Sequence, residues 1–95
     1  MTAKKIVDFN VAPLLSTHAA IAEYMSQVFA DGESDEIIRA LGHVAKARGM
    51  AMLARESGLG RESLYKALAP GAKPRFDTVL RVCRALKLPL QPVAG

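Results

Sequence analysis

The sequence has 95 residues, of which 51% are hydrophobic and 23% charged, and its formal net charge is +4. A chain of this size and apolar content buries enough surface to fold as one domain, which excludes a disordered chain. No apolar run approaches the roughly 18 residues that span a bilayer. The N-terminal stretch Met-Thr-Ala-Lys-Lys-Ile also lacks the apolar core of a signal peptide. We therefore expect a cytoplasmic protein that has no membrane partner.

Charge is divided unevenly along the chain. Residues 1–47 contain 4 Lys or Arg and 6 Asp or Glu, whereas residues 48–95 contain 9 and 3, so the two halves carry −2 and +6. A basic half is the electrostatic footprint of a phosphate-binding surface, although many solvated helices are basic for solubility alone. Charge by itself leaves both interpretations open.

The N-terminal residues 1–15 are expected to form an extended arm. Val7, Phe9 and Val11 alternate before Pro13, which is typical of an extended segment with one apolar edge. Such an arm either covers the core of its own domain or docks on a partner protein.

Two helices are predicted after this arm. The first begins near Ser16 or Thr17, which are both good N-caps, and ends at Asp31-Gly32; the second is capped by Ser34 and ends at Gly49. The apolar stripe of the first comprises Ile21, Tyr24, Met25, Val28 and Phe29, and one face of the second is shared by Ile37, Leu41, Val44, Ala45 and Arg48.

Three further helices are predicted, at Met50–Ser57, at Arg61–Ala69 and from about Asp77 to Leu86. Gly58 makes a tight turn between the first two, and Leu53 and Ala54 point inward. The last helix is predicted to bury Phe76, Val79, Leu80, Cys83 and Leu86 and to expose Arg81, Arg84 and Lys87.

The predicted fold class is all-α, with five helices in a single domain at residues 16–95. Residues 37–86 match the spacing of a helix-turn-helix core, in which a supporting helix precedes two short helices and a closing helix follows them. Residues 88–95 form a short extended tail, which Pro89 and Pro92 restrict to an edge strand or a pairing between two chains.

The helix at residues 61–69 is the candidate recognition helix. At 100° per residue Leu64, Ala67 and Leu68 point inward, which leaves the opposite face outward. The candidate DNA base contacts are Arg61 to guanine, Glu62 to cytosine and Lys66 to guanine or a phosphate. The candidate phosphate contacts are Ser63, Tyr65, Lys73 and Arg75. The alternative is an ordinary solvated helix face, on which Glu62 and Lys66 form a weak i, i+4 pair.

A resemblance to known families covers nearly the whole chain. The stretch Arg48-Gly49-Met50-Ala51-Met52-Leu53-Ala54-Arg55-Glu56-Ser57-Gly58-Leu59 resembles the Xre/lambda-repressor-like family, in which an alanine packs the two helices and a glycine makes the turn. More narrowly, the chain is similar to the addiction-module antidote family, which includes HigA-like antitoxins. This second resemblance rests on Phe9-Asn10-Val11-Ala12, Ile21-Ala22-Glu23-Tyr24, Ala47-Arg48-Gly49-Met50, Arg61-Glu62-Ser63-Leu64-Tyr65-Lys66-Ala67-Leu68 and Pro74-Arg75-Phe76-Asp77-Thr78-Val79-Leu80.

The resemblance implies an antitoxin that neutralises a RelE/HigB-like toxin by direct contact and represses their shared promoter. Two positions depart from the family pattern, which has Thr-Gln in place of Ala51-Met52 and Ser in place of Gly60. The glutamine reaches a phosphate, which Met52 cannot do, whereas a glycine cap costs only a few tenths of a kcal/mol. We expect the fold to survive and the affinity for DNA to fall.

Catalytic and metal-binding chemistry finds no support in the sequence. Cys83 is the only cysteine and lies on an apolar stripe, while His18 and His43 are far apart and neither has a catalytic partner at site spacing. The acidic residues around position 33 suit a loop and a helix start rather than a metal site. We expect a protein that is not an enzyme and has no cofactor and no metal.

Three functions remain open. The first is a toxin–antitoxin antidote whose basic part binds operator DNA as a homodimer, while its apolar arm or acidic first helices contact the toxin. The second is a stand-alone small repressor. The third is a protein-binding module that has lost DNA binding through Ala51, Met52 and Gly60.

Overall fold

The computed structural model describes residues 16–88 and Leu90. This part of the chain contains five α-helices and no strand, which confirms the predicted all-α class. The predicted arm at residues 1–15 and most of the predicted tail, residues 89 and 91–95, lie outside the described residues. The helices are α2 (His18–Asp31), α3 (Ser34–Arg48), α4 (Met50–Ser57), α5 (Arg61–Ala67) and α6 (Phe76–Ala85).

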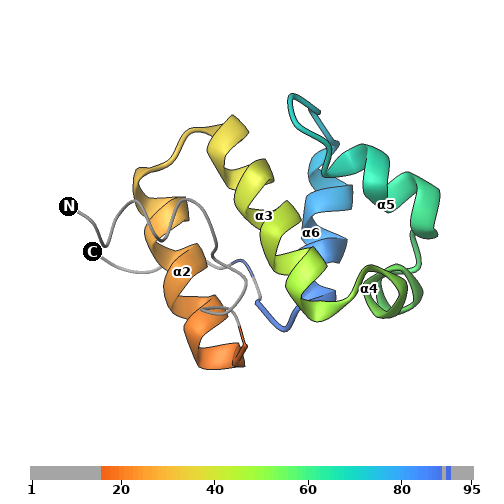
Figure 1. Ribbon diagram of the computed structural model, residues 1–95. Helices are drawn as coiled ribbons and strands as arrows, with labels where there is room; N and C mark the ends of the chain where they lie inside the picture. Colours follow the sequence, from red (N-terminus) through yellow and green to blue (C-terminus); the bar gives the residue numbers. More distant parts are fainter. Residues whose placement is uncertain (1–15, 89, 91–95) are drawn as a thin grey trace.

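Helix α3 runs through the middle of the described structure (Figure 1). Helix α2 packs against α3, α4 packs against α3, α5 and α6, and α5 lies at the end of the molecule away from α2. The longest of these helices, α3, has 15 residues, and among the described helices none is long and apolar enough to cross a membrane.

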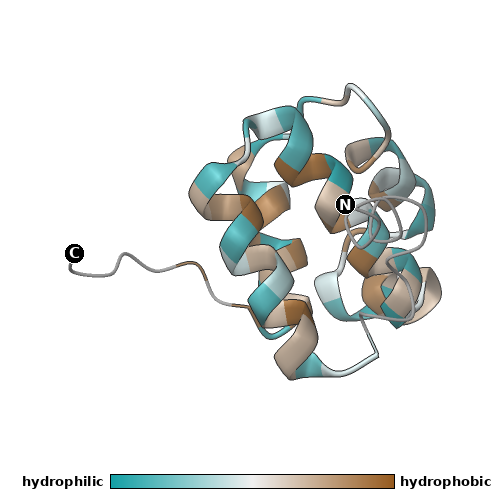
Figure 2. Cartoon of the chain, turned by 60° about the vertical axis from the view of Figure 1, so that its left-hand side comes forward, coloured by the Kyte–Doolittle hydropathy of each residue, from teal (hydrophilic) through white to brown (hydrophobic). Residues whose placement is uncertain are grey.

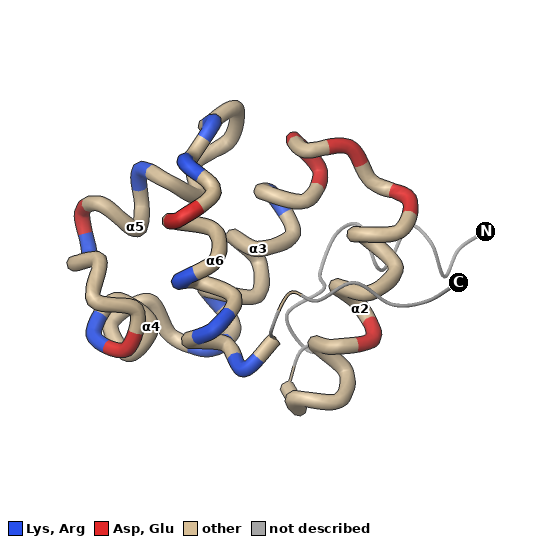
Figure 3. Tube along the Cα trace, turned by 180° about the vertical axis from the view of Figure 1, so that it is seen from behind, with Lys and Arg blue, Asp and Glu red and all other residues tan. Residues whose placement is uncertain are grey.

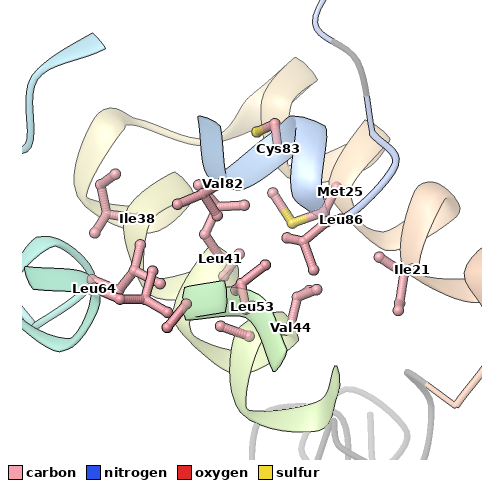
Figure 4. Close-up of a cluster of buried hydrophobic side chains, with 14 residues drawn as sticks. Ile21, Met25, Ile38, Leu41, Val44, Leu53, Leu64, Val82, Cys83 and Leu86 are labelled. Atoms are coloured by element: carbon pink, nitrogen blue, oxygen red, sulfur yellow. The ribbon is translucent and has the colours of Figure 1, made fainter. Parts of the chain in front are cut away.

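A single hydrophobic core joins the five helices (Figure 4). Hydrophobic residues lie on the inner faces of the helices, and hydrophilic residues lie mostly outside (Figure 2). Complete burial of one large apolar side chain, such as a leucine or an isoleucine, contributes about 1.5–3 kcal/mol to the free energy of unfolding. The buried hydrophobic residues are Ile21, Met25, Ile38, Ala40, Leu41, Val44, Ala45, Leu53, Ala54, Leu64, Leu68, Val82, Cys83 and Leu86.

The predicted helix starts are confirmed for α2 and displaced by one residue for α3. Thr17 caps α2, since its Oγ1 accepts a hydrogen bond from the Ala20 N–H at 3.1 Å. The cap of α3 is Glu33 rather than Ser34. The Glu33 N–H donates to Glu36 Oε1 at 2.8 Å, and this local bond places Ser34 inside the first turn.

Helix α5 ends at Ala67, two residues before the predicted end. Leu68 leaves helical geometry with φ −103° and ψ 11° and enters the core with 8% of its surface exposed. Ala69 precedes Pro70, and a residue before proline is disfavoured in the helical region. Pro70 therefore favours an end of α5 before Ala69, earlier than the helical periodicity predicts.

One prediction of burial was wrong. Phe76, expected in the core, is 69% exposed because it begins α6 at the edge of the molecule, and α6 instead buries Val82 completely. The buried face of α6 is thus turned toward Val82, which leaves Val79 and Leu80 half-buried. Arg48, expected to share a face of α3 with Leu41 and Val44, is exposed at the end of that helix.

Candidate nucleic-acid interface

The turn between α4 and α5 is formed by backbone geometry that suits glycine. Gly58 has φ 76° and ψ 13°, the left-handed conformation, and its N–H donates to the Ala54 carbonyl at 3.1 Å. The buried Ser57 hydroxyl donates to the same carbonyl at 3.3 Å and accepts from the Leu59 N–H at 3.3 Å. These bonds fix the direction in which the chain enters α5.

Gly60 precedes α5 with φ 76° and ψ 152°, a backbone conformation that residues other than glycine rarely adopt. From sequence, the only expected effect of this glycine is the loss of a serine cap at small cost. The structure corrects that view, because the glycine supports a backbone conformation that serine would adopt only under strain.

Helix α5 is anchored by one face and exposed on the other. Leu64 is fully buried and Leu68 is 8% exposed, as predicted. On the outer face, all five predicted contact residues of the helix are exposed to solvent. These residues are Arg61, Glu62, Ser63, Tyr65 and Lys66.

Three of the seven predicted contact residues line one shallow pocket. Ser63 and Lys66 of α5 reach it from one side, and Lys73 of the following loop reaches it from the other. The pocket has a volume of about 370 Å³, and Thr78 of α6 contributes a further hydroxyl-bearing side chain. Two lysines and two hydroxyl-bearing residues around one depression suit a phosphate. The sequence analysis missed Thr78, although its position just after the basic loop was a usable signal.

The other four predicted residues are arranged differently. The Arg61 guanidinium lies over the Tyr65 ring, 5.9 Å from its centroid, which is within cation–π range. Glu62 and Arg75 are exposed and do not line the pocket. The alternative Glu62–Lys66 ion pair is absent from the two ion pairs of the described residues.

Charged residues are segregated in space as well as in sequence (Figure 3). Acidic residues gather where α2 meets α3, whereas most basic residues lie on α4, α5, α6 and the loop before α6. One ion pair links the two regions, since Lys73 Nζ lies 3.6 Å from Asp35 Oδ1. Both side chains are largely exposed, so this pair is screened and weak.

The remaining reactive side chains have structural positions. Cys83 is fully buried, and burial raises the pKa of its thiol from 9.0 to about 11, which keeps it protonated at neutral pH. His18 Nε2 lies 2.8 Å from the Lys87 carbonyl and links the start of α2 to the end of α6. Within residues 16–88 and Leu90, no group of three or more His, Cys, Asp or Glu is placed to hold a metal ion.

Comparison with known proteins identifies the family. No solved structure matches this chain significantly. A protein of Haemophilus influenzae (strain ATCC 51907 / DSM 11121 / KW20 / Rd), described only as uncharacterized, is 39% identical over 88 residues, which cover 93% of this chain and 91% of that protein. The family model described as "Probable addiction module antidote protein" matches residues 5–94. The chain therefore belongs to the family of probable addiction module antidote proteins.

Proposed function

We propose that this protein is the antidote of a type II toxin–antitoxin module. In this proposal it neutralises a RelE/HigB-like toxin by direct contact and represses the promoter of the two genes. Membership of the antidote family supports the first activity. The second rests on α4 and α5, which we propose act as the helix-turn-helix of a lambda-repressor-like domain.

The observation that carries the DNA-binding proposal is the placement of α5. Leu64 fixes the helix to the core, and the opposite face presents polar and basic side chains to solvent. We assign Arg61 to a guanine, Glu62 to a cytosine amino group and Lys66 to a guanine or phosphate. The assigned phosphate contacts are Ser63, Tyr65, Lys73 and Arg75.

The active form in this proposal is a homodimer. One short recognition helix reads too few base pairs for useful specificity, and two-fold symmetry presents two such helices to paired half-sites. The charge distribution supports a division between DNA binding and toxin binding. In this proposal the basic residues of α4, α5, α6 and the loop before α6 face DNA, and the acidic residues where α2 meets α3 remain free to contact the toxin.

DNA binding is tested by titrating the purified protein onto its own promoter fragment at two salt concentrations. Arg61→Ala is expected to weaken binding by about 1–3 kcal/mol and to relax the base preference at one position. Lys73→Ala is expected to weaken binding to all sequences and to reduce the salt slope by about one. Arg39→Ala is the matched control, because it removes an exposed charge of α3 outside the proposed surface.

Neutralisation is tested by expressing the product of the neighbouring reading frame with and without this protein. Growth arrest that this protein relieves, together with co-purification of the two chains, is the expected result. Salt-dependent promoter binding without any effect on the neighbouring product would favour a stand-alone repressor. A stable complex of the two proteins that does not bind promoter DNA at either salt concentration would leave a protein-binding module as the remaining function.

A further inference from the structure

Exposed aromatic side chains are concentrated at one place outside α5. The large hydrophobic residues exposed in the described structure are Phe29 at 37%, Tyr65 at 47% and Phe76 at 69%. Tyr65 belongs to the proposed DNA-binding face. Phe29 and Phe76 are 47 positions apart in the sequence, yet both line the same groove.

This groove lies between the end of α2, the start of α3 and the start of α6. Its volume is about 400 Å³, and its lining is mostly hydrophobic. Ile38 is buried against the core, whereas Ile37 and Val79 are half-buried. The groove is thus an open extension of the core. An exposed, contiguous apolar surface of this kind marks an interaction site more often than a scattered surface residue does.

The rim of the groove is acidic on the side where α2 meets α3. Acidic residues gather there (Figure 3). Asp31, Glu33, Asp35 and Glu36 are all exposed and lie in the stretch between Phe29 and Ile37, which both line the groove. One of the four carboxylates, Asp35, lies near a cation, Lys73, at 3.6 Å. Three carboxylates beside an apolar groove favour a partner whose own contact surface is basic around an apolar side chain.

The groove is separate from the proposed recognition helix. It contains no residue of α4 or α5, and it shares only the loop at residues 72–74 with the pocket beside α5. A protein seated in the groove therefore leaves the outer face of α5 exposed. Lys73 is the contact point between the two surfaces, since it belongs to both.

We propose that this groove is the docking site for the toxin, which inserts an apolar side chain framed by Lys or Arg. The inference rests on the proposed antidote function and adds to it the surface and the chemistry of the partner. Phe76 is the central anchor, because it is the most exposed aromatic residue and gains the most from being covered. The acidic rim attracts the basic partner and accelerates its association.

The test measures binding of the purified neighbouring gene product to variants of the full chain by calorimetry. Phe76→Ala is expected to weaken binding at least about thirtyfold, as truncation of an aromatic anchor does, and Phe29→Ala is expected to weaken it less. Met52→Ala is the matched control, since it removes an apolar side chain of α4 outside the groove. Thermal unfolding of each variant checks the fold, and Phe29→Ala still tests the groove if Phe76→Ala is unstable.

The acidic rim is tested by kinetics. Asp31→Asn is expected to slow association severalfold at low salt and to have little effect at high salt, because screening removes the attraction. Glu56→Gln of α4 is the charge-matched control and is expected to leave the rate unchanged. Equal rates for both variants and the unmodified protein would overturn the role of the rim.

Two outcomes separate the docking site from the function. If the unmodified protein binds the neighbouring product and the Phe76→Ala variant binds it equally well, the proposed docking site is wrong and the antidote function stands. If the unmodified protein does not bind that product, the antidote function and the groove fail together. If Phe76→Ala instead converts a dimer of this chain to a monomer, a second copy covers the groove and the proposed occupant is wrong.

Discussion

The α4–α5 hairpin and the corner between α2 and α3 place side chains on the surface in different ways. The hairpin is held by fully buried anchors, Leu53 and Leu64, and by two glycines with positive φ. The corner is held by a helix cap at Glu33 and leaves Phe29 exposed. Because its inner side chains are buried in the core, the hairpin presents its outer polar groups in one orientation. The corner between α2 and α3, in contrast, still exposes apolar surface that a partner could bury.

The largest expected effect tests the anchoring of the hairpin. Leu64→Ala should lower the free energy of unfolding by about 2–5 kcal/mol, because it leaves a cavity beneath α5. Ile37→Ala at the corner should cost less than half as much, since Ile37 is only half-buried. Urea unfolding measures both values. Equal losses would mean that the two regions do not differ in anchoring.

The next effect concerns the core beneath both regions and depends on pH. The pKa of the Cys83 thiol is about 11 in the folded protein and 9.0 ordinarily, so the unfolded chain loses this proton first. The stabilisation that comes from keeping the Cys83 thiol protonated is therefore fully present below pH 9. As the pH rises from 9 to about 11, the free energy of unfolding falls by up to about 1.4 kcal/mol per pH unit. Urea unfolding at several pH values measures it. Cys83→Ala should lack this component, and an unchanged slope in that variant would assign it to other groups.

A smaller effect distinguishes the two glycines of the hairpin. Gly60→Ala should destabilise the protein by about 1–3 kcal/mol, because φ 76° with ψ 152° is nearly restricted to glycine. Gly58→Asn should cost less than about 1 kcal/mol, since asparagine tolerates the left-handed conformation of that position. Thermal unfolding compares them. The interpretation fails if the two substitutions are equally tolerated.

The smallest effect is expected at the ion pair between the two regions. Asp35→Asn should change the free energy of unfolding by no more than about 0.5 kcal/mol, because both partners are mostly exposed. Chemical unfolding at low and high salt measures it, and Asp77→Asn, which removes the Arg81 pair, is the matched control. A loss above 1 kcal/mol would show that the pair holds the loop before α6 in place.

Prediction from sequence succeeded where the cause is local. The glycine stop at Gly49, the turn at Gly58 and the inward position of Leu64 follow from backbone freedom and helical periodicity within a few residues. The candidate contact residues on α5 could be named for the same reason. The gathering of two of them, Ser63 and Lys66, with Lys73 around one pocket could not be predicted, because it depends on how the next loop folds back.

The sequence alone determined five helices, most of their ends and the uneven division of charge, since each of these depends on neighbouring residues. The sequence also predicted that Cys83 and Leu86 are buried, whereas only the tertiary structure decided that Val82 is buried and Phe76 is exposed. The apolar residues of α6 allow more than one inward face, and the packed core buries Val82 and leaves Phe76 exposed. The groove that joins Phe29 to Phe76 exists for the same reason, because contacts between helices distant in sequence are set by the packing of the whole core.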